Sequence, residues 1–210
     1  MTEAADWATI TEQRLLDAAL GLIPQKGWSR AMALEAGRAA GLSAAETDLL
    51  LPRGPADLAA LLSRRHDAAA LAALPDPASL KIRERIRAAV AARLDAACAE
   101  EASVRRWTGF LALPPNLSLA ARLLWETADA LWRWAGDTAT DENHYSKRAL
   151  LSAILAAGLA IRLTSGKAAA MKHVDARIEN VMAFEKWKAG VKPADVMRDV
   201  ATALGRIRYR

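Results

Sequence analysis

Hydrophobic residues recur at helical spacing through most of the chain. The first stripe is made of apolar residues three or four positions apart and is ended by a proline and a glycine: Ile10, Leu15, Leu16, Ala19, Leu20 and Ile23, then Pro24 and Gly27. Shorter helices are expected over residues 31–40 and 43–51, on either side of Gly41. Because strands have no obvious place in this pattern, it predicts an all-α fold of about nine or ten helices.

The same spacing divides the rest of the chain into further helices. We expect helices over residues 56–74, 80–99, 118–135, 141–163 and 168–189, and a final one from Pro193 to about Arg208. The Pro75–Asp76–Pro77 sequence interrupts the helical pattern and is the most plausible boundary. The predicted organisation is therefore an N-terminal module over residues 1–74, a bundle over 75–192 and a C-terminal helix over 193–210.

Two of these helices are too apolar for a position on one side of a core. Residues 118–135 and 148–163 carry apolar side chains around most of their circumference, which indicates that they are buried or line a cavity. Small residues such as Ala153, Ala156 and Gly158 leave room beside them. The residues expected to line this cavity are Leu123, Leu124, Ala128, Leu131, Trp132, Leu150, Leu151 and Ile154.

Composition favours a folded protein without a membrane-crossing helix. The 210 residues are 53% hydrophobic and 25% charged, which is typical of a globular chain. The N-terminus lacks the basic and apolar regions of a signal peptide, so a cytoplasmic location is expected. The longest apolar run, residues 149–161, would span only about 20 Å of the roughly 30 Å that a bilayer requires.

The distribution of charge disfavours binding to nucleic acid. The net charge is +5, but residues 1–60 contain five basic and eight acidic residues. The helix over 43–51, which would read the major groove in a helix-turn-helix module, offers Glu46 and Asp48 and no base before Arg53. Carboxylates would repel phosphates, so we expect no nucleic-acid partner.

An acidic corner raises the question of catalysis or metal binding. Residues 134–148 read WAGDTATDENHYSKR and bring acids next to a histidine and a tyrosine. Gly136 suits a helix C-cap and Thr140 can cap the next helix, so Asp141 and Glu142 fall in a first turn where negative charge is favourable. The spacing matches no metal-ligand pattern. We therefore expect a helix corner with no metal and no cofactor.

The other candidate groups are single residues. Cys98 lies in a helical pattern and is expected to be a buried, unreactive thiol. His66 and His173 are expected to be solvated helix residues. Since no nucleophile elbow or phosphate-binding glycine loop accompanies them, the residues give no argument for an enzyme.

Several blocks of the sequence carry resemblances to known families. TEQRLLDAALGLIPQKGWSRAMALEAGRAAGLSAAETDLLL resembles the DNA-binding end of TetR-type repressors. FLALPPN, LLWETADALWRWAGDT and TDENHYSKRALL resemble a family of ubiquinone (coenzyme Q) biosynthesis accessory proteins. That resemblance implies a TetR-like helical bundle with a degenerate helix-turn-helix, a homodimer without catalytic activity, and an isoprenoid or quinone lipid held in a helical pocket.

The resemblance also implies a partner and a docking surface. The partner is a di-iron demethoxyubiquinone hydroxylase, to which the family presents quinone intermediates at the membrane. Carried onto this sequence, the docking residues are Asp141, His144 and Tyr145. Where the family commonly has tryptophan, this chain has His144. The alternative function is a ligand-responsive TetR-type repressor, which would share the pocket and differ in binding DNA.

The last predicted helix, residues 193–210, combines a short apolar stripe with arginines near its end. This pattern suits a helix at an anionic membrane surface on the inner face of the membrane. It equally suits an amphipathic helix that packs on its own bundle, but the resembling family has a membrane-associated C-terminal helix. The residues expected to contact the membrane are Val196, Val200, Leu204, Arg206, Ile207 and Arg208.

Overall fold

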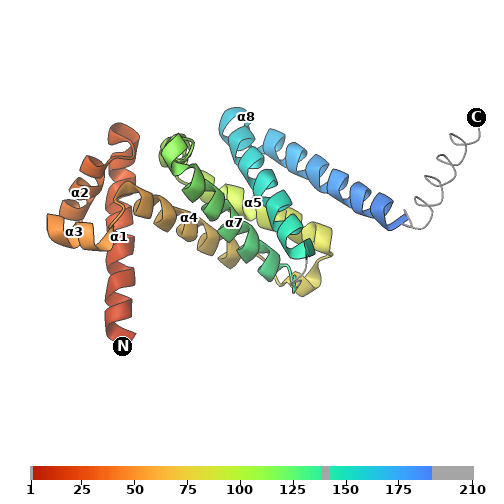
Figure 1. Cartoon of the computed structure of the whole chain (residues 1–210), viewed down its shortest axis with the longest axis horizontal. Helices are drawn as coiled ribbons and strands as arrows, with labels where there is room; N and C mark the ends of the chain where they lie inside the picture. The colour runs from red at the N-terminus through yellow and green to blue at the C-terminus, as the bar shows by residue number, and fades with distance from the viewer. Residues whose placement is uncertain (1, 139–141, 191–210) are drawn as a thin grey trace, which may run out of the picture.

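A computed structural model describes residues 2–138 and 142–190, and these residues form α-helices with two short 3-10 turns and no strand (Figure 1). The elements are α1 (Thr2–Lys26), α2 (Arg30–Ala39), α3 (Ala44–Leu50), α4 (Pro55–Ala72), η1 (Pro77–Ser79), α5 (Ile82–Cys98), α6 (Glu101–Leu111), η2 (Pro114–Asn116), α7 (Leu117–Trp134) and α8 (Glu142–Gly190). The all-α prediction is confirmed. The predicted helix over 193–210 lies outside the described residues.

The predicted and observed helices differ in two places. Helix α6 was not predicted, although its Val104, Trp107 and Leu111 follow helical spacing. Helix α8 joins two predicted helices, so eight helices are described against the expected nine or ten. Backbone angles at Gly166 are not helical (φ 84, ψ 178), so α8 consists of two arms that meet at this residue.

The N-terminal helices form a helix-turn-helix in which α3 begins with a capping box. Ser43 and Glu46 form a capping box at the start of α3: the Ser43 amide donates to Glu46 Oε2 at 2.8 Å, and the Glu46 amide donates to Ser43 Oγ at 3.2 Å. The turn passes through Gly41 at a positive φ of 82°, a conformation that favours glycine. The acid Asp48 on α3 pairs with Arg30 at 2.8 Å.

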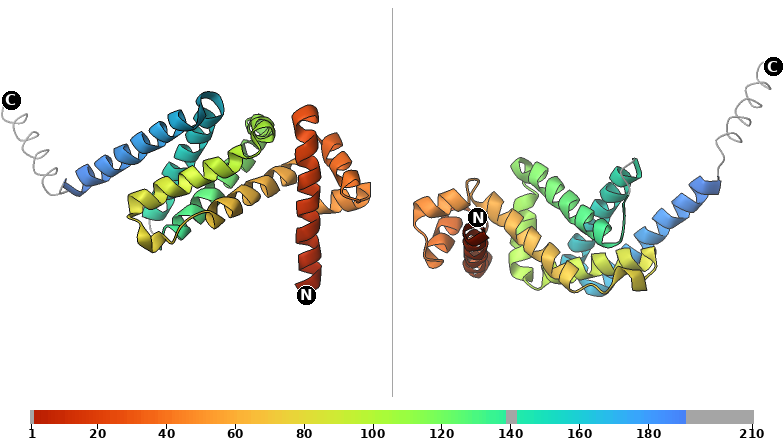
Figure 2. Two further views of the ribbon diagram at one scale, coloured as in Figure 1. Left: turned by 180° about the vertical axis from the view of Figure 1, so that it is seen from behind. Right: turned by 90° about the horizontal axis from the view of Figure 1, so that it is seen from below.

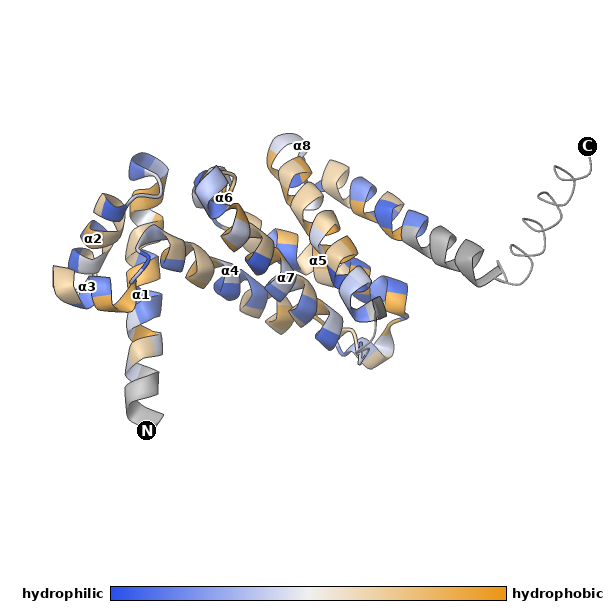
Figure 3. Cartoon of the chain, viewed as in Figure 1, coloured by the Kyte–Doolittle hydropathy of each residue, from blue (hydrophilic) through white to orange (hydrophobic). Residues whose placement is uncertain are grey.

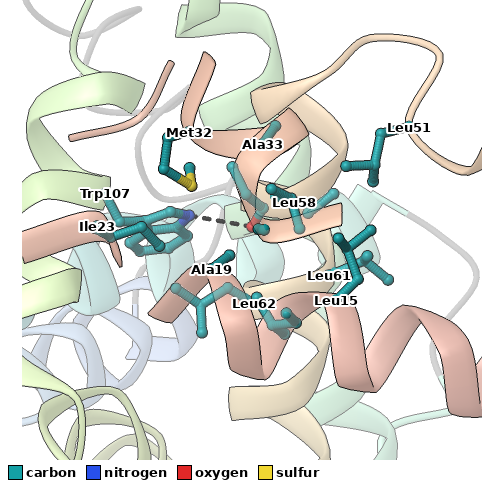
Figure 4. Packing of buried hydrophobic residues seen from close by; sticks show 14 of the residues in the cluster. Leu15, Ala19, Ile23, Met32, Ala33, Leu51, Leu58, Leu61, Leu62 and Trp107 are labelled. Carbon is teal, nitrogen blue, oxygen red and sulfur yellow. Dashed lines mark hydrogen bonds between the residues drawn. The ribbon is translucent and has the colours of Figure 1, made fainter. Parts of the chain in front are cut away.

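A first hydrophobic core joins the N-terminal helices to α6 and the beginning of α7. Figure 4 shows Trp107 of α6 entering this core beside Ile23 and Met32, and its indole nitrogen donates to the Ala59 carbonyl at 3.1 Å. Residues from both sides of the Pro75–Pro77 boundary therefore share one core. The division into three predicted segments stays a prediction.

A second hydrophobic core lies between α5, α7 and α8. Its fully buried members include Val90 on α5, Leu131 on α7 and Val174 on α8. Gly158 allows the first arm of α8 to approach α5, because a Cβ at this position would lie 3.2 Å from Leu94. The views of Figures 1 and 2 place α1–α3 and the second arm of α8 at opposite ends of an elongated molecule.

Ion pairs fasten the second arm of α8 along α5. Three pairs join the two helices, each at 2.6 Å between nitrogen and oxygen: Lys167–Asp95, Arg87–Asp175 and Arg83–Glu179. The partners run in opposite directions along the two helices, as an antiparallel arrangement requires. Because these side chains are exposed, each pair contributes at most about 1 kcal/mol, and the set fixes alignment more than stability.

One stretch of α8 is apolar and long enough to cross a membrane by length and composition. It spans His144–Asn180. Within it, 28% of the most apolar 18-residue segment is buried. Apolar residues predominate along the first arm of α8 (Figure 3). The apolar run over 149–161 alone is too short to cross a bilayer, whereas this longer stretch has the required length and composition. The break at Gly166 nevertheless divides the stretch.

Candidate functional site

A largely apolar cavity of about 570 Å³ lies between α6, α7 and the first arm of α8, with contributions from α4 and α5. Its volume falls in the range of sites that bind small molecules. The lining residues are Ser63, Arg93, Leu94, Arg105, Trp107, Thr108, Leu111, Ala112, Leu117, Ala120, Leu123, Leu124, Thr127, Leu155, Ala156, Leu159, Ala160, Leu163 and Thr164.

Helical spacing produces the two long walls of the cavity. On α7, lining residues recur at three- and four-residue intervals from Leu117 to Thr127, which corresponds to about 15 Å along the helix axis. The first arm of α8 supplies the facing wall from Leu155 to Thr164. The Ser152 hydroxyl on α8 donates to the Leu124 carbonyl on α7 at 3.2 Å and fixes the two walls relative to each other. The cavity is therefore elongated.

One end of the cavity is polar and buried. Arg93 Nε donates to Asp67 Oδ1 at 2.6 Å, and Arg93 Nη2 donates to the Ser63 hydroxyl at 3.3 Å. The Thr127 hydroxyl also donates to the Asp67 carboxylate, at 2.8 Å. Arg93, Ser63 and Thr127 all line the cavity, and all three are buried. This network therefore brings one arginine, with its charge balanced, to the inner end of an apolar channel.

The opposite end of the cavity is more exposed. Arg105 on α6 donates to Glu101 and to the Leu163 carbonyl of α8, which holds these helices together at this end. Leu117, at the start of α7, is 54% exposed. Along the α8 wall, Ala156 and Ala160 line the cavity and are also exposed. A ligand could therefore enter beside these small residues.

The structure distributes the predicted cavity residues over three environments. Leu123 and Leu124 line the cavity. The residues Ala128, Leu131, Leu151 and Ile154 are buried in the second core, with Trp132 packed against it. The indole of Trp132 donates to the Lys147 carbonyl at 3.1 Å. Leu150 is 45% exposed on the surface. The cavity therefore lies nearer the start of α7 and the middle of α8 than the sequence indicated.

The lining residues from α4, α5 and α6 were not predicted from the sequence. Ser63 and Arg93 give no local signal, because their proximity depends on how α4 and α5 pack. The α6 residues could have been found from the spacing of Val104, Trp107 and Leu111, which marks an amphipathic helix.

In the described part of the acidic corner between α7 and α8, hydrogen bonds and ion pairs stabilise the turn. Gly136 takes a positive φ of 90°, and the Asp137 amide donates to the Trp132 carbonyl at 3.0 Å, as in a glycine-ended helix. Asp137 pairs with Lys147 at 2.6 Å and with Arg148 at 3.0 Å. Burial raises the pKa of Asp137, but the hydrogen bonds and charges of Lys147 and Arg148 outweigh it and lower the pKa.

Arg148 connects the two helices that meet at this corner. Its side chain is 2% exposed, and its Nε donates to Asp129 at 2.6 Å. Its Nη1 donates to Asp137 at 3.0 Å and to the His144 carbonyl at 3.2 Å. The arginine therefore joins the acids of α7 and the turn to the first turn of α8.

Three aromatic side chains gather beside this corner, and we call them the aromatic patch: Trp125, His144 and Tyr145. The Trp125 ring centroid lies 6.4 Å from that of His144 and 6.0 Å from that of Tyr145, while His144 and Tyr145 are 5.2 Å apart. Tyr145 is 64% exposed. The structure thus brings together two of the predicted docking residues and adds Trp125, whereas Asp141 lies outside the described residues.

His66 is buried, so its prediction as a solvated residue was wrong. It is 2% exposed, and its Nε2 lies 2.7 Å from Glu100 Oε2. Burial and, to a smaller extent, the positive charge of Arg93 lower the pKa of His66 to about 4, against the opposing effects of Glu100 and Asp67. The sequence could not show this because Glu100 lies 34 residues away, at the start of α6.

Other groups that could support metal or thiol chemistry are sparse among the described residues. Over this part of the chain, no three His, Cys, Asp or Glu side chains cluster as metal ligands would. Burial raises the pKa of the Cys98 thiol despite the nearby charge of Arg162, which disfavours the reactive thiolate.

The comparisons with known proteins find similarity to the same family. Residues 117–185 match the COQ9 family profile. The chain is similar to the COQ9 proteins. It is 29% identical over 158 residues to ubiquinone biosynthesis protein COQ9-B, mitochondrial, of Xenopus laevis, covering 68% of this chain and 52% of that protein. It is 28% identical over 151 residues to ubiquinone biosynthesis protein COQ9, mitochondrial, of Homo sapiens, covering 68% and 48%.

The match to the COQ9 family contains both long walls of the cavity. Residues 117–185 contain all of α7 and most of α8, including the aromatic patch. The COQ9 protein of Xenopus tropicalis is 29% identical over 157 residues, covering 68% of this chain and 48% of its own length. The chain therefore spans about half the length of the curated COQ9 relatives it matches.

Proposed function

We propose that this protein is a non-catalytic accessory protein of ubiquinone biosynthesis that binds an isoprenoid quinone intermediate in the cavity between α6, α7 and α8. The observation that carries this proposal is the elongated apolar cavity, one wall of which is α7, within the segment that matches the COQ9 family. The relatives named as ubiquinone biosynthesis proteins supply the pathway.

The shape and chemistry of the cavity favour a lipid tail over a polar metabolite. Leucine and alanine side chains form most of the two long walls. Burying an apolar chain there contributes about 25 cal/mol for each Å² removed from water. The polar groups lie mainly at the ends, so a ligand with a long apolar part and one polar end matches the lining.

The role in presentation rests on the aromatic patch. Exposed aromatic side chains are enriched at protein–protein interfaces because they provide large apolar area together with polar tips. We propose that Trp125, His144 and Tyr145, with Asp141, dock a di-iron demethoxyubiquinone hydroxylase. In this arrangement the partner would sit beside the helices that hold the lipid, and the chemistry would occur on the partner.

Membrane contact and dimerisation complete the proposal. We propose that residues 193–210 associate with the inner face of the membrane as an amphipathic helix. Support for dimerisation comes from α8. Leu150 on its first arm is 45% exposed, and most of the apolar 18-residue segment of α8 is not buried within the single chain. A second copy that covers this arm would remove apolar area from water.

Lipid extraction tests the proposed function. The full chain is purified under mild conditions from cells that make ubiquinone, and the bound lipids are identified by mass spectrometry. We expect isoprenoid quinones or their precursors to be enriched over a control protein of similar size prepared in parallel. Recovery of phospholipid alone, or of no lipid, would argue against the proposal.

A further inference from the structure

The inner end of the cavity contains a polar network that an apolar tail does not need. Arg93 is 6% exposed, Ser63 is 2% and Thr127 is 3%, and all three line the cavity. Placing a charged side chain beside an apolar cavity is costly unless it forms hydrogen bonds. The position of this network therefore points to a ligand with a polar group at that end.

Resting on the proposed function, we propose that Arg93, Ser63 and Thr127 form a headgroup subsite that binds a neutral ring bearing carbonyl or hydroxyl oxygens at the end of an isoprenoid chain. The long apolar walls take the chain, and the subsite determines which headgroup is accepted and in which direction the lipid lies.

The hydrogen-bonding capacity of the network fits oxygen acceptors. Arg93 uses Nε for Asp67 and Nη2 for Ser63. Among the described residues, Nη1 of Arg93 has no acceptor, so it can donate to a ligand oxygen. The Thr127 hydroxyl gives its proton to Asp67, which leaves its oxygen able to accept from a ligand hydroxyl. Both quinone carbonyls and phenolic hydroxyls therefore find partners.

The charge of the network selects against an anionic headgroup. Asp67 lies 2.6 Å from Arg93 and its side chain is 14% exposed, so the positive charge of the arginine is already balanced. A diphosphate would bring a second anion close to Asp67 without a second cation from this end. The only other arginine of the lining, Arg105, lies at the opposite end and pairs with Glu101. A neutral headgroup avoids this repulsion.

The test compares three ligands that share one tail. The full chain is titrated with a geranylgeranyl-substituted para-benzoquinone, with geranylgeranyl diphosphate and with the geranylgeranyl hydrocarbon, and binding is measured by native mass spectrometry. We expect the wild-type protein to bind the quinone at least about tenfold more tightly than either of the others. A difference of this size is what one hydrogen bond from a charged donor contributes to binding.

Substitution separates the subsite from the rest of the cavity. Arg93→Lys keeps the positive charge opposite Asp67 but removes the planar group with its additional donor. It should bring the quinone-to-hydrocarbon ratio close to one without changing hydrocarbon affinity. The matched control Arg87→Lys, on the same helix but exposed and outside the cavity lining, should keep the wild-type ratio.

The outcomes distinguish the subsite from the proposed function. If the wild-type protein binds all three ligands alike, or favours the diphosphate, the headgroup subsite is wrong while lipid binding stands. If Arg93→Lys folds and retains the full preference for the quinone, the assignment of Arg93 is wrong. If the wild-type protein binds none of the three, the proposed function fails together with the subsite.

Discussion

At the scale of single residues, the interior keeps its charged groups in compensated pairs. Arg93 has Asp67, and Arg148 has both Asp129 and Asp137, each within 3.0 Å. Removal of one partner from such a group leaves the other charge buried and uncompensated. These arginines therefore affect stability far more than surface arginines do.

Replacing Arg148 with methionine should strongly destabilise the protein. The substitution leaves Asp129 and Asp137 without their shared partner, and we expect the free energy of unfolding to fall by about 3–5 kcal/mol. The measurement is urea denaturation followed by circular dichroism at neutral pH. Arg133→Met is the control, because Arg133 also pairs with Asp129 but is 72% exposed, so its effect should be about 0.5 kcal/mol. Equal losses in the two variants would contradict this account.

His66 should make stability sensitive to mild acid. Its pKa is about 4 in the folded protein against 6.5 ordinarily, so the unfolded chain binds the extra proton first as pH falls. The contribution is fully present above about pH 6.5 and is lost as pH falls toward about 4. The wild-type protein should lose about 2 kcal/mol more than His66→Gln between pH 7 and pH 5. Parallel stability curves for the two proteins would rule out His66 as the cause.

Residues whose role depends on near neighbours were predictable, and residues whose role depends on distant partners were not. Gly136 at a helix end and the Ser43–Glu46 capping box are local features that sequence spacing shows directly. Arg93 and His66 depend on partners 26 and 34 residues away, Asp67 and Glu100. A buried histidine and a surface histidine look alike until the packing of α4 and α5 is known.

At the scale of elements, helix ends with chemical markers were found more reliably than breaks between adjacent helices. Proline and glycine mark the ends of α1–α4 in the sequence. Helix α6 was missed because only two residues separate it from the end of α5 and because it carries no proline or strong cap at its start. The two predicted parts of α8 are real as separate arms, since Gly166 breaks the helix.

Helices α2 and α3 pack closely because Gly37 on α2 has no side chain. A Cβ on Gly37 would lie 2.0 Å from Thr47 Oγ1, so Gly37→Ala should force the helices apart and lower the free energy of unfolding by about 1–3 kcal/mol. Thermal denaturation gives the comparison. In Gly21→Ala, the control, the Cβ meets nothing within 4 Å, and helix propensity should stabilise the protein by about 0.5–1 kcal/mol. A stabilising effect at both positions would show that the contact is relaxed.

The aromatic patch should affect partner binding without affecting the fold. His144→Ala together with Tyr145→Ala removes two of its rings, and we expect at least a fivefold loss in capture of a demethoxyubiquinone hydroxylase, roughly the effect of 1 kcal/mol. The control Trp7→Ala removes another exposed aromatic residue, which is 56% exposed on α1, and should leave capture unchanged. If the patch variant also loses several degrees of melting temperature, the rings stabilise the fold and the docking assignment is wrong.

At the scale of the whole molecule, the cavity results from the way two hydrophobic cores meet. The first core holds α6 and the beginning of α7, the second holds the remainder of α7 with α5 and α8, and the cavity opens where their boundaries meet. The sequence predicted that α7 and α8 have more apolar surface than one core needs. It could not place the cavity along these helices, because that position depends on α4, α5 and α6.

The central claim is that an isoprenoid lipid occupies this cavity, and blocking the cavity tests it most directly. The double variant Ala156→Phe and Ala160→Phe places two rings on lining positions at the exposed edge, while Ala153→Phe places one on the same arm outside the lining. The measurement is the amount of geranylgeranyl para-benzoquinone retained per chain after gel filtration, by mass spectrometry. The account predicts retention near the wild-type amount for Ala153→Phe and at least a tenfold loss for a folded double variant. Equal retention in all three proteins would contradict it.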